Sequence, residues 1–487
     1  MDEFEALYRA VEARDSRWDG RVYVGVTSTG IYCRPVCPVP MPRREHVRFH
    51  PNAAAAEKAG FRACRRCRPE ESPGSPDWDV RGDLVGRALR LIESGIVDES
   101  GVDGLARRLA LSTRHVHRLL VEEIGVGPLA LAHSRRAGLA KQLLDQTELS
   151  SIDIAFASGF RSLSAYNAAV RRSFGRSPTE IRAHRRAGPG GPGIRLRLAY
   201  RPPLAIDALF AFLEARAIPG VEAVSGTEYR RAVRGAAGTE AALLRLRPGR
   251  VAPGSPTGGP VMELAIDAVG PGELAPLVRS ARRLLDLDAD PVAIDGALAA
   301  DDRLASLVAA TPGMRLPAAF DGFATAVLAV LAQGVTLAAA RAMAGRLAAA
   351  FGEPVELDDP AIHRLFPTPA ALAAADLTSL RLAGRSARTV RALAWAVASG
   401  RVALDDAADP VATAEALAAI PGIGPWTTGH VALRILRDPD AFPRGDAAVR
   451  AAFRRLGLPA DARSIAARAE TWRPWRGYAL AHLWALA

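Results

Sequence analysis

Residues 417–433 read LAAIPGIGPWTTGHVAL, in which two apolar segments flank a short turn of glycine and proline. Gly422 and Gly424 permit a tight backbone turn, and Pro425 suits the first turn of a following helix. The free N–H groups at the start of that second helix can bind a phosphate. We therefore predict a helix-hairpin-helix that contacts a DNA backbone through Gly422, Ile423 and Gly424. Because Pro-Gly-x-Gly is a weak signal by itself, an ordinary helix–loop–helix is the alternative.

An aspartate follows this turn at the start of another predicted helix. Asp446, in AFPRGDAAVRAAF, lies 24 residues after Gly422. An aspartate in such a position is more often a simple N-cap, which is the alternative interpretation. A hairpin followed at this distance by Pro-x-Gly-Asp resembles the HhH-GPD DNA glycosylases. The last residues, ETWRPWRGYALAHLWALA, resemble the AlkA-type 3-methyladenine DNA glycosylases II, and the resemblance covers about residues 194–487.

The resemblance implies that Asp446 is the catalytic residue. A buried carboxylate beneath the sugar would stabilise the positive charge that builds on the deoxyribose and would orient the attacking water. Alkylated purines such as 3-methyladenine are already good leaving groups, and the target nucleotide must be flipped out of the duplex. No lysine follows Lys141, which excludes Schiff-base chemistry there. We expect a monofunctional glycosylase that leaves an abasic site, with Trp426 standing where lyase-type relatives carry their lysine.

Aromatic side chains should line the base pocket, because a cationic, electron-deficient base stacks well on electron-rich rings. The resemblance assigns this role to Trp426, Trp484 and Phe212, and it places His430 in the same pocket. Two other tryptophans, Trp395 and Trp472, are expected in the hydrophobic core.

Three positions depart from the family pattern. His430 stands where the family often has another aromatic residue. Gly334 stands where a leucine wedge would fill the gap left by the flipped base, and Val335 could take over that role. Ala448 is smaller than the leucine expected near Asp446. These departures motivate an alternative, in which the chain is a transcription regulator with an inactive or altered-specificity glycosylase domain.

All four cysteines of the chain fall within one short segment, as Cys33, Cys37, Cys64 and Cys67. Two close pairs, C-x3-C and C-x2-C, suit one tetrahedral zinc ion, and a disulfide is not expected in a cytoplasmic protein. On spacing alone, a zinc site that only stabilises the fold is the better interpretation. No four-cysteine iron–sulfur cluster can exist in the rest of the chain.

The sequence around these cysteines, TGIYCRPVCP and AGFRACRRCRP, closely resembles the N-terminal domain of the Ada adaptive-response proteins over roughly residues 1–70. The resemblance implies that Cys33 accepts a methyl group from a methyl phosphotriester in DNA. Zinc would keep the sulfur deprotonated and nucleophilic. Methylation makes the site less negative, so DNA affinity should rise and the repair event becomes a switch. The arginines expected to contact the DNA backbone are those at 34, 62, 65, 66 and 68, with Arg34 and Arg65 foremost.

The middle of the chain contains an internal repeat. LARRLALSTRHVHRLLVEEIGVGP at 105–128 and IAFASGFRSLSAYNAAVRRSFGRSP at 154–178 share an apolar start, a polar turn, an apolar-periodic helix and a closing Gly-x-x-Pro. The second half resembles AraC-type regulators, so we expect two helix-turn-helix units joined by a helix around 129–144. Helices beginning near Ser112 and Ser162 would each enter a major groove. The candidate DNA contacts are Arg114, His115, His117, Arg118, Arg161, Ser164 and Asn167. A helical protein-interaction bundle is the alternative.

The predicted fold is multidomain and mostly α-helical. We expect a small α+β zinc domain at 1–75, an all-α double helix-turn-helix at 76–187, a small α+β module with an antiparallel sheet at 194–273, and an all-α helix-hairpin-helix glycosylase domain at 274–487. Two proline- and glycine-rich linkers separate these parts, ESPGSPD at 71–77 and AGPGGPG at 187–193, and the second predicts flexible coupling.

Alternating segments in the α+β module predict its strands. They are IRLRLAY, EYRRAVRG, AALLRLRP and VMELAIDAV, with one helix at 206–216 between the first two. PTGGP at 256–260 is expected to be a hairpin loop.

The composition fits this organisation. The chain has 487 residues, 49% of them hydrophobic, which predicts three or four globular domains. The net charge of +11 predicts a polyanionic partner, for which the alternative is arginine enrichment by a GC-rich genome. With neither a secretory signal nor a spanning apolar run, a cytoplasmic, nucleoid-associated protein is expected.

The expected partners follow from these motifs. Double-stranded DNA is the main one, RNA polymerase is a further candidate, and we expect a monomer that holds one zinc ion. Binding of a monovalent cation at the hairpin carbonyls is an alternative that the sequence leaves open. No cysteine follows residue 67, so the Pro-Cys-His-Arg motif of methylguanine repair is absent and repair of O6-methylguanine is not expected.

Overall fold

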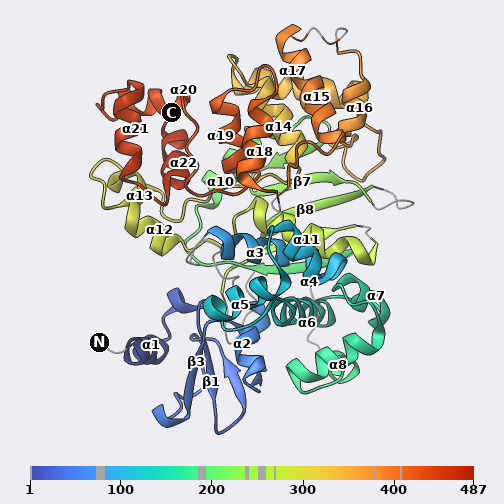
Figure 1. The fold of residues 1–487 in the computed structure, drawn as a ribbon, viewed down its shortest axis with the longest axis vertical. Helices are drawn as coiled ribbons and strands as arrows, with labels where there is room; N and C mark the ends of the chain where they lie inside the picture. The colour runs from blue at the N-terminus through green and yellow to red at the C-terminus, as the bar shows by residue number, and fades with distance from the viewer. Residues whose placement is uncertain are drawn as a thin grey trace. The chain divides into compact units, whose positions relative to one another are not determined.

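The computed structural model describes residues 3–72, 83–184, 193–235, 241–249, 259–267, 270–377, 380, 382, 384–405 and 408–487 (Figure 1). The chain divides into two compact units. The first holds Met1–Arg201, Pro248–Arg282 and Leu287–Asp290, and the second holds Pro202–Arg247, Arg283–Asp286 and Pro291–Ala487. Most of the two predicted linkers and of the predicted hairpin loop lies outside the described residues, so these expectations stay predictions.

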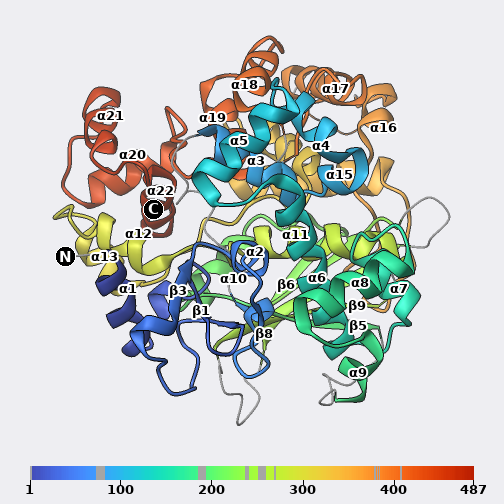
Figure 2. The same cartoon turned by 60° about the horizontal axis from the view of Figure 1, so that its bottom comes forward.

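A small four-stranded sheet carries the cysteine segment of the first unit (Figure 2). The strand order is β3-β1-β2-β4, with β1 antiparallel to β2 and β3, and β2 parallel to β4. Its elements are α1 Glu3–Glu12, β1 Tyr23–Val26, β2 Ile31–Cys33, β3 Val47–His50, α2 Ala53–Lys58 and β4 Arg62–Ala63, with 3-10 helices at Ser16–Trp18, Arg44–His46 and Pro69–Glu71. Cys33 ends β2 and Cys64 follows β4, so the parallel strand pair brings the two cysteine pairs together.

The sequence repeat is a structural repeat of helix pairs that both contact one long helix, α6. The helices are α3 Asp83–Glu93, α4 Ile96–Arg108, α5 Thr113–Ile124, α6 Pro128–Gln146, α7 Ser151–Ala157, α8 Leu163–Phe174 and α9 Pro178–Ala183. Ser112 and Ser162 accept hydrogen bonds from the backbone N–H three residues on, so α5 and α8 begin where the sequence predicts. Gly125 and Gly175 end these helices with φ of 81° and 65°, which suits glycine. The prediction of two helix-turn-helix units is confirmed.

An antiparallel strand pair completes the first unit. β5 Ile194–Ala199 pairs with β9 Val261–Ile266. Two glutamines of α6 hold β5: Gln142 Nε2 donates to the Arg197 carbonyl at 2.9 Å, and Arg197 N donates to Gln146 Oε1 at 2.8 Å. The 3-10 helix Pro271–Glu273 and most of α11 Leu274–Leu284 follow.

The second unit combines an antiparallel sheet with a helical body. The sheet consists of β6 Glu222–Ser225, β7 Glu228–Val233 and β8 Ala242–Gly249, most of which lies in this unit. The helices are α10 Ile206–Glu214, α12 Pro291–Leu298, α13 Ala305–Ala310, α14 Gly322–Leu331, α15 Leu337–Phe351, α16 Pro369–Ala374, α17 Gly384–Ala398, α18 Pro410–Ala418, α19 Pro425–Arg434, α20 Ala447–Arg455, α21 Ala462–Glu470 and α22 Arg476–Leu486. The core centres on the apolar helix α14, whose Phe323, Val327 and Leu331 are buried among α15, α17 and α19.

The predicted strands are confirmed as β5, β7, β8 and β9, and the predicted helix at 206–216 is α10. β6 was not predicted, because its sequence EAVS is too short to show alternation. The strands of the predicted module at 194–273 fall in both units, and the domain boundaries stay predictions. None of the described helices is long and apolar enough to cross a bilayer.

The prediction that Trp395 lies in the core is wrong. Its side chain on α17 is 51% exposed, and the guanidinium of Arg401 lies 4.4 Å from the centroid of its ring. The opposite face of α17 enters the core instead, through Val390 and Leu393. Trp472 is buried as predicted, and its Nε1 donates a hydrogen bond to Asp301 Oδ2 at 2.7 Å.

Candidate active site and metal centre

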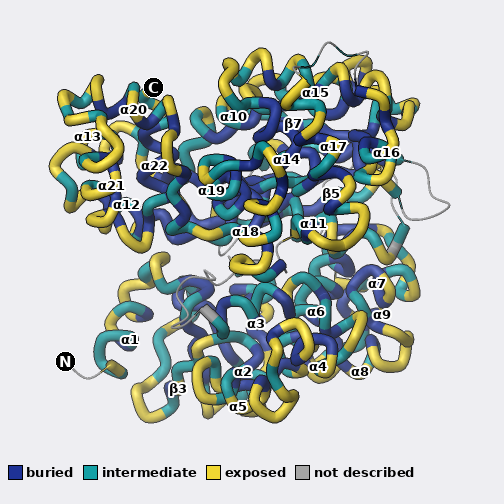
Figure 3. Tube along the Cα trace, turned by 45° about the horizontal axis from the view of Figure 1, so that its top comes forward, coloured by how far each residue is buried: buried dark blue, intermediate teal, exposed yellow. Residues whose placement is uncertain are grey.

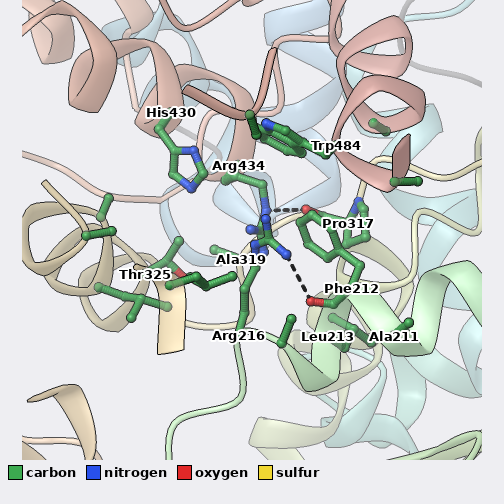
Figure 4. A pocket seen from close by; sticks show the side chains of 18 of the residues that line it. Ala211, Phe212, Leu213, Arg216, Pro317, Ala319, Thr325, His430, Arg434 and Trp484 are labelled. Carbon is green, nitrogen blue, oxygen red and sulfur yellow. Dashed lines mark hydrogen bonds between the residues drawn. The ribbon is translucent and has the colours of Figure 1, made fainter. Parts of the chain in front are cut away.

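A cavity of about 1400 Å³ opens within the second unit (Figure 4). It lies between α10, the turn that joins α14 to α15, and the helices α19, α20 and α22. The structure brings all five predicted residues to its wall, namely Phe212, Trp426, His430, Asp446 and Trp484. The cavity is large enough for a nucleobase, since ligand pockets commonly measure about 300–1,000 Å³.

Asp446 is both the N-cap of α20 and part of the cavity wall. Its Oδ1 accepts a hydrogen bond from the Val449 N–H at 3.0 Å, and its Oδ2 accepts one from Trp426 Nε1 at 2.9 Å. The residue is only 7% exposed. The N-cap interpretation and the site interpretation are therefore compatible, because each oxygen serves a different partner.

The aromatic residues of the cavity form two stacked pairs. The rings of Trp426 and His430 have centroids 5.2 Å apart and an interplanar angle of 20°, and those of Phe212 and Trp484 are 6.0 Å apart at 29°. His430 also lies 5.9 Å from Trp484, at 48°, which connects the two pairs. Four aromatic rings from α10, α19 and α22 are thus gathered at one cavity.

Two arginines join these rings, and neither was predicted. The guanidinium carbon of Arg216 lies 3.6 Å from the Phe212 ring centroid and 5.4 Å from that of Trp484. The guanidinium carbon of Arg434 lies 4.7 Å from the Phe212 centroid. Arg216 donates to the Phe212 carbonyl at 3.2 Å, and Arg434 donates to the Pro317 carbonyl (Figure 4). Helical spacing in the sequence could have indicated them, because each arginine follows a predicted pocket residue by four positions.

Burial decides the charges in this cavity. Burial, and then the charges of Arg434 and Arg216, lower the pKa of His430 well below its usual value, so the imidazole is neutral at pH 7. Burial also lowers the pKa of Arg216 to about 9 and that of Arg434 to about 10, so both remain cationic at pH 7. The charge of Asp446 acts on Arg216 in the opposite direction. The Nδ1 atom of His430 is buried without a hydrogen-bond partner among the described residues.

The predicted hairpin lies between α18 and α19. Gly422 has φ of +94°, and a Cβ there would lie 2.1 Å from Thr389 Oγ1, so only glycine fits. Thr389 Oγ1 donates to the Pro421 carbonyl at 3.0 Å, and Gln333 Nε2 donates to the Gly422 carbonyl at 3.0 Å. Ile423 is buried, while a Cβ on Gly424, the N-cap of α19, would meet nothing within 4 Å. The turn thus leaves open space at Gly424, the residue before α19, whereas Gly422 is tightly enclosed.

The positions that depart from the family pattern also line the cavity. Gly334 has φ of +73° and open space around it. Val335 follows it in the same turn and is 46% exposed, which is unusual for a large apolar side chain. Ala448 lies in the first turn of α20, next to Asp446.

The four cysteines form a cluster in the first unit. Their sulfur atoms all lie within 4.8 Å of one another, all four residues are buried, and none forms a disulfide. Tetrahedral zinc with bonds of about 2.3 Å would hold its sulfurs about 3.8 Å apart, so the cluster fits this ion. Contacts with the Cys37 and Cys64 thiols, and then burial, raise the pKa of Cys33. A positive ion is therefore needed for four thiolates to coexist here.

A small cavity of about 70 Å³ gives access to this cluster from one side. Among its lining residues are Cys33 and Cys37, with Arg14, Pro35 and Met41, whereas Cys64 and Cys67 are not among them. Two of the four cysteines thus line this cavity, and the predicted methyl acceptor is one of them.

The prediction that Arg34 contacts DNA needs correction, because its side chain is only 5% exposed. Its Nε donates to Asp19 Oδ1 at 2.8 Å and its Nη2 to Asp19 Oδ2. Its backbone N–H donates to Cys67 Sγ at 3.3 Å, and Nη1 donates to the Cys67 carbonyl at 3.3 Å. Arg34 therefore supports the cysteine cluster from inside the fold. Arg65, by contrast, is exposed.

Most of the predicted helix-turn-helix contacts lie on the surface (Figure 3). The exposed ones are Arg114, His115, His117 and Arg118 on α5 and Ser164 on α8, together with Arg161 just before α8. Asn167 is half-buried. Arg161 already donates to the backbone carbonyls of Asp98 at 2.8 Å and Glu99 at 3.1 Å. Four of the seven predicted contacts are thus exposed side chains of α5.

Four protein-family models match successive parts of the chain. The metal binding domain of Ada matches residues 6–70, and a helix-turn-helix domain matches residues 105–184. The AlkA N-terminal domain matches residues 195–321, and the HhH-GPD superfamily of base excision DNA repair proteins matches residues 327–477. The fold and sites thus define a fusion of a zinc- and DNA-binding regulatory half with a DNA glycosylase half.

Similarity to individual proteins identifies the family more closely. The chain is 43% identical over 488 residues to the probable bifunctional transcriptional activator/DNA repair enzyme AlkA of Mycobacterium tuberculosis, a match that covers 99% of this chain and 96% of that protein. It is 33% identical over 290 residues to DNA-3-methyladenine glycosylase 2 of Escherichia coli, covering 59% of this chain and 95% of that protein. A 3-methyladenine DNA glycosylase structure from Archaeoglobus fulgidus has the same fold, with a TM-score of 0.50 and 20% identity over 59% of this chain and 97% of that one. The chain belongs to the family of the mycobacterial bifunctional protein.

Proposed function

We propose that this protein responds to DNA alkylation with two separate chemistries. Its second unit hydrolyses the N-glycosidic bond of alkylated bases of the 3-methyladenine type, as a monofunctional glycosylase that uses Asp446. Its first unit accepts methyl groups from DNA methyl phosphotriesters on Cys33 and thereby activates sequence-specific DNA binding and transcription. The observation that carries the glycosylase proposal is a buried carboxylate, bonded to Trp426, in a wall of stacked aromatic rings.

In the glycosylase step, the C1′–N bond of a flipped nucleotide breaks and the base leaves with both electrons. The Asp446 carboxylate stabilises the positive charge on the sugar and orients a water molecule, whose oxygen forms the new bond to C1′. The water gives up a proton to the Asp446 carboxylate, which passes it on to solvent, and an abasic site remains. Trp426 holds Oδ2 of Asp446 in place, and the cap bond from Val449 holds Oδ1. No amine of a lysine follows Lys141, so no covalent lyase step takes place in this half.

In the methyl transfer, the Cys33 sulfur attacks the methyl carbon of the phosphotriester. The S–C bond forms as the C–O bond breaks, and the phosphodiester anion leaves with the electron pair. Cys33, Cys37, Cys64 and Cys67 would hold one zinc ion, which supplies the positive charge that keeps the sulfurs as thiolates. The position of Cys33 in the wall of a small cavity supports its role as acceptor.

The methylated site carries one negative charge fewer, which favours binding to phosphates. Arg65 of the zinc domain and the exposed Arg114, His115 and Arg118 of α5 would then contact DNA, with Ser164 and Asn167 of α8 as further contacts. RNA polymerase remains a candidate partner and a monomer the expected state. A monovalent cation at the hairpin stays a prediction, and the Pro421 and Gly422 carbonyls already accept hydrogen bonds from protein groups.

Release of radiolabelled 3-methyladenine from alkylated duplex DNA tests the glycosylase proposal. We expect release by the wild type and a loss of at least about a hundredfold in Asp446→Asn. Asparagine is as good an N-cap as aspartate, so this variant preserves α20. Equal release by Asp446→Asn and the wild type would overturn the catalytic assignment.

Mass spectrometry after incubation with methyl-phosphotriester DNA tests the acceptor. We expect one added methyl group on the peptide that contains Cys33. If the methyl group is absent, the zinc site is structural only.

One observation favours a second candidate function. His430 and Gly334 replace residues that the family pattern expects at the cavity, which motivates a regulator whose glycosylase is inactive or altered. The release assay separates the two functions: a wild type that binds promoter DNA after methylation but releases no damaged base would favour the regulator.

A further inference from the structure

One side of α17 carries positive charge without a balancing acid. Residues 377–404 contain five arginines and no aspartate or glutamate. Arg385, Arg388 and Arg391 on α17 are exposed, and so is Arg401 just beyond the end of the helix. Within the part of the chain that the structure describes, none of these four side chains forms an ion pair or a hydrogen bond. We call these four residues the α17 arginine stripe.

Elsewhere in the second unit, exposed arginines do have acidic partners. Arg473 pairs with Glu470 at 2.7 Å and Arg234 pairs with Glu353, although both arginines are about half exposed. Arginine enrichment by composition alone would leave such pairs on every surface. The stripe differs because acids are absent from its whole segment, and an unbalanced positive surface of this kind suits a polyanion.

An exposed tryptophan lies on the same side of the helix. Successive helical residues turn by about 100°, so Arg388, Arg391 and Trp395 fall within an arc of about 60°. The Trp395 side chain is 51% exposed, and the guanidinium carbon of Arg401 lies 4.4 Å from the centroid of its ring. This cation–π contact holds a fourth positive charge at the end of the stripe. It gives a role to an aromatic residue that the core does not use.

The stripe begins beside the helix-hairpin-helix. Thr389, on the same helix, donates from Oγ1 to the Pro421 carbonyl at 3.0 Å, and a Cβ on Gly422 would lie 2.1 Å from that oxygen. Arg385 lies one helical turn before Thr389 on nearly the same side, and Arg388 is the direct neighbour of Thr389. The positive charges therefore continue outward from the turn that we expect to contact a DNA phosphate.

The length of the stripe suits a DNA backbone. An α-helix rises about 1.5 Å per residue, so the segment from Arg385 to Trp395 spans about 15 Å. Each strand of a duplex carries one phosphate per about 3.4 Å of its axis, so about four phosphates fall within that length. The guanidinium of arginine is always charged and matches the geometry of a phosphate, so the contact needs no base.

We propose that the α17 arginine stripe binds the phosphate backbone of the same DNA duplex that the hairpin contacts. The contact extends the footprint of the glycosylase beyond the damaged nucleotide and is independent of base sequence. It acts on the affinity of the second unit for DNA and on the salt dependence of that affinity, and not on the breaking of the glycosidic bond. This inference rests on the proposed glycosylase function of the same unit.

The test measures the release of 3-methyladenine from alkylated duplex DNA with the full chain in excess, at several protein and salt concentrations. The quantity compared is the protein concentration that gives half-maximal release. Neutralising Z phosphates gives a slope of about −0.9Z in a plot of log binding constant against log salt. For the triple variant Arg388→Gln/Arg391→Gln/Arg401→Gln we expect a slope smaller in magnitude by about 2–3. At about 50 mM salt its half-maximal concentration should be at least about tenfold higher.

Two controls separate charge from structure. The triple lysine variant of the same positions keeps the charges, and its slope should stay within about 0.5 of the wild-type value. Arg463→Gln removes an exposed arginine of α21 that has no acidic partner among the described residues. It should leave the slope unchanged, whereas the matched single variant Arg388→Gln should reduce its magnitude by about 0.9.

An unchanged slope in the triple glutamine variant would overturn the proposal, because the stripe would then be an ordinary solvated surface. Equal losses in the glutamine and lysine variants would also overturn it. If the wild type releases no base, the proposed glycosylase function itself fails, which is a distinguishable result.

A measurement that needs no activity tests the stripe in either case. Hydroxyl-radical footprinting is carried out with the full chain on a duplex that contains one tetrahydrofuran abasic-site analogue. We expect the wild type to protect about four more backbone positions beside the analogue than the triple glutamine variant does. If the triple variant does not fold, as judged by thermal unfolding, Arg388→Gln takes its place and should lose about one of these positions. Identical footprints of the wild type and the variant would overturn the proposal.

Discussion

The zinc domain and the base cavity each place arginines beside a reactive group, but they balance the positive charge differently. Arg34 lies next to the cysteine cluster and forms a buried ion pair with Asp19 through two nitrogens. Arg216 and Arg434 lie in the wall of the base cavity, where the carbonyls of Phe212 and Pro317 are their acceptors. A paired guanidinium holds a fold together, whereas one that faces an open cavity acts on whatever enters it.

Two further arginines near Asp19 also have acceptors within the fold. Arg201 donates to the Asp19 carbonyl through Nε at 3.1 Å and Nη2 at 2.8 Å, and to the Asp288 carbonyl at 2.9 Å. Arg21 pairs with the buried Asp290 at 3.3 Å. Arg21, Arg34 and Arg201 are thus each held by acceptors within this unit.

The largest expected effect is the loss of the metal. We predict that Cys67→Ser, or treatment with a strong chelator, abolishes zinc binding and unfolds the sheet of residues 3–72, because structural zinc contributes about 10–16 kcal/mol in small domains. Zinc content and amide hydrogen exchange of β1 and β2 measure this. The second unit, which contains no cysteine, serves as the control and should unfold at an unchanged temperature. Stoichiometric zinc in Cys67→Ser would contradict the four-ligand site.

The next largest effect is the loss of the Asp19 carboxylate. Asp19→Asn leaves the Arg34 guanidinium buried without its counter-charge, which should cost about 3–5 kcal/mol of unfolding free energy. Denaturant unfolding of the zinc-loaded chain measures this cost. Arg17→Gln is the matched control, because it breaks the exposed Arg17–Asp15 pair and should have a much smaller effect on the unfolding free energy. Equal losses of unfolding free energy in the two variants would contradict a greater contribution of the buried Arg34–Asp19 ion pair than of the exposed one.

A smaller effect is expected at the cavity carboxylate. Trp426→Phe keeps an aromatic ring beside His430 and removes the Nε1 hydrogen bond to Asp446. Hydrogen bonds to charged groups contribute about 1.5–3 kcal/mol, so single-turnover base release should fall about 10- to 100-fold. Trp472→Phe is the control, because it removes an equivalent bond to Asp301, outside the cavity. It should lower stability and leave the release rate unchanged.

The smallest effect concerns pH. Burial lowers the pKa of His482 on α22 to about 4, and its Nε2 has no partner among the described residues. The unfolded chain protonates this histidine near pH 6.5, so the folded state loses stability as the pH falls from 6.5 toward 4. At pH 5.5 the loss should be about 1.4 kcal/mol relative to pH 7.5, and His482→Leu should be spared it. The same pH dependence in both proteins would contradict the neutral buried state.

A residue's structural role could be predicted from the sequence when the group it bonds to lies only a few residues away. Helix starts at Ser112 and Ser162 were predictable because each cap bonds a backbone group three residues away. The role of Arg34 was predicted wrongly because its ion-pair partner, Asp19, lies on another segment of the chain. The burial of Trp395 was predicted wrongly because it lies on the exposed face of α17.

The same reason explains which residues of the base cavity were predicted and which were not. Asp446 and the aromatic residues were predicted because a family pattern carries them. Arg216 and Arg434 were not, because only the packing of α10 and α19 places both against the Phe212 ring. Charge at a cavity wall is a property of the fold, whereas a metal-ligand spacing is already present in the sequence.

We infer that one chain carries two chemically independent sites, and measuring both products in one sample tests their independence. The full chain is incubated with duplex DNA that contains both methyl phosphotriesters and 3-methyladenine. Released base and the methyl mass on the Cys33 peptide are then measured in the same sample. For Asp446→Asn we predict that base release falls at least about a hundredfold while methylation of Cys33 proceeds to the wild-type extent. Undiminished base release would contradict the role of Asp446, and the loss of both signals together would contradict the independence of the two sites.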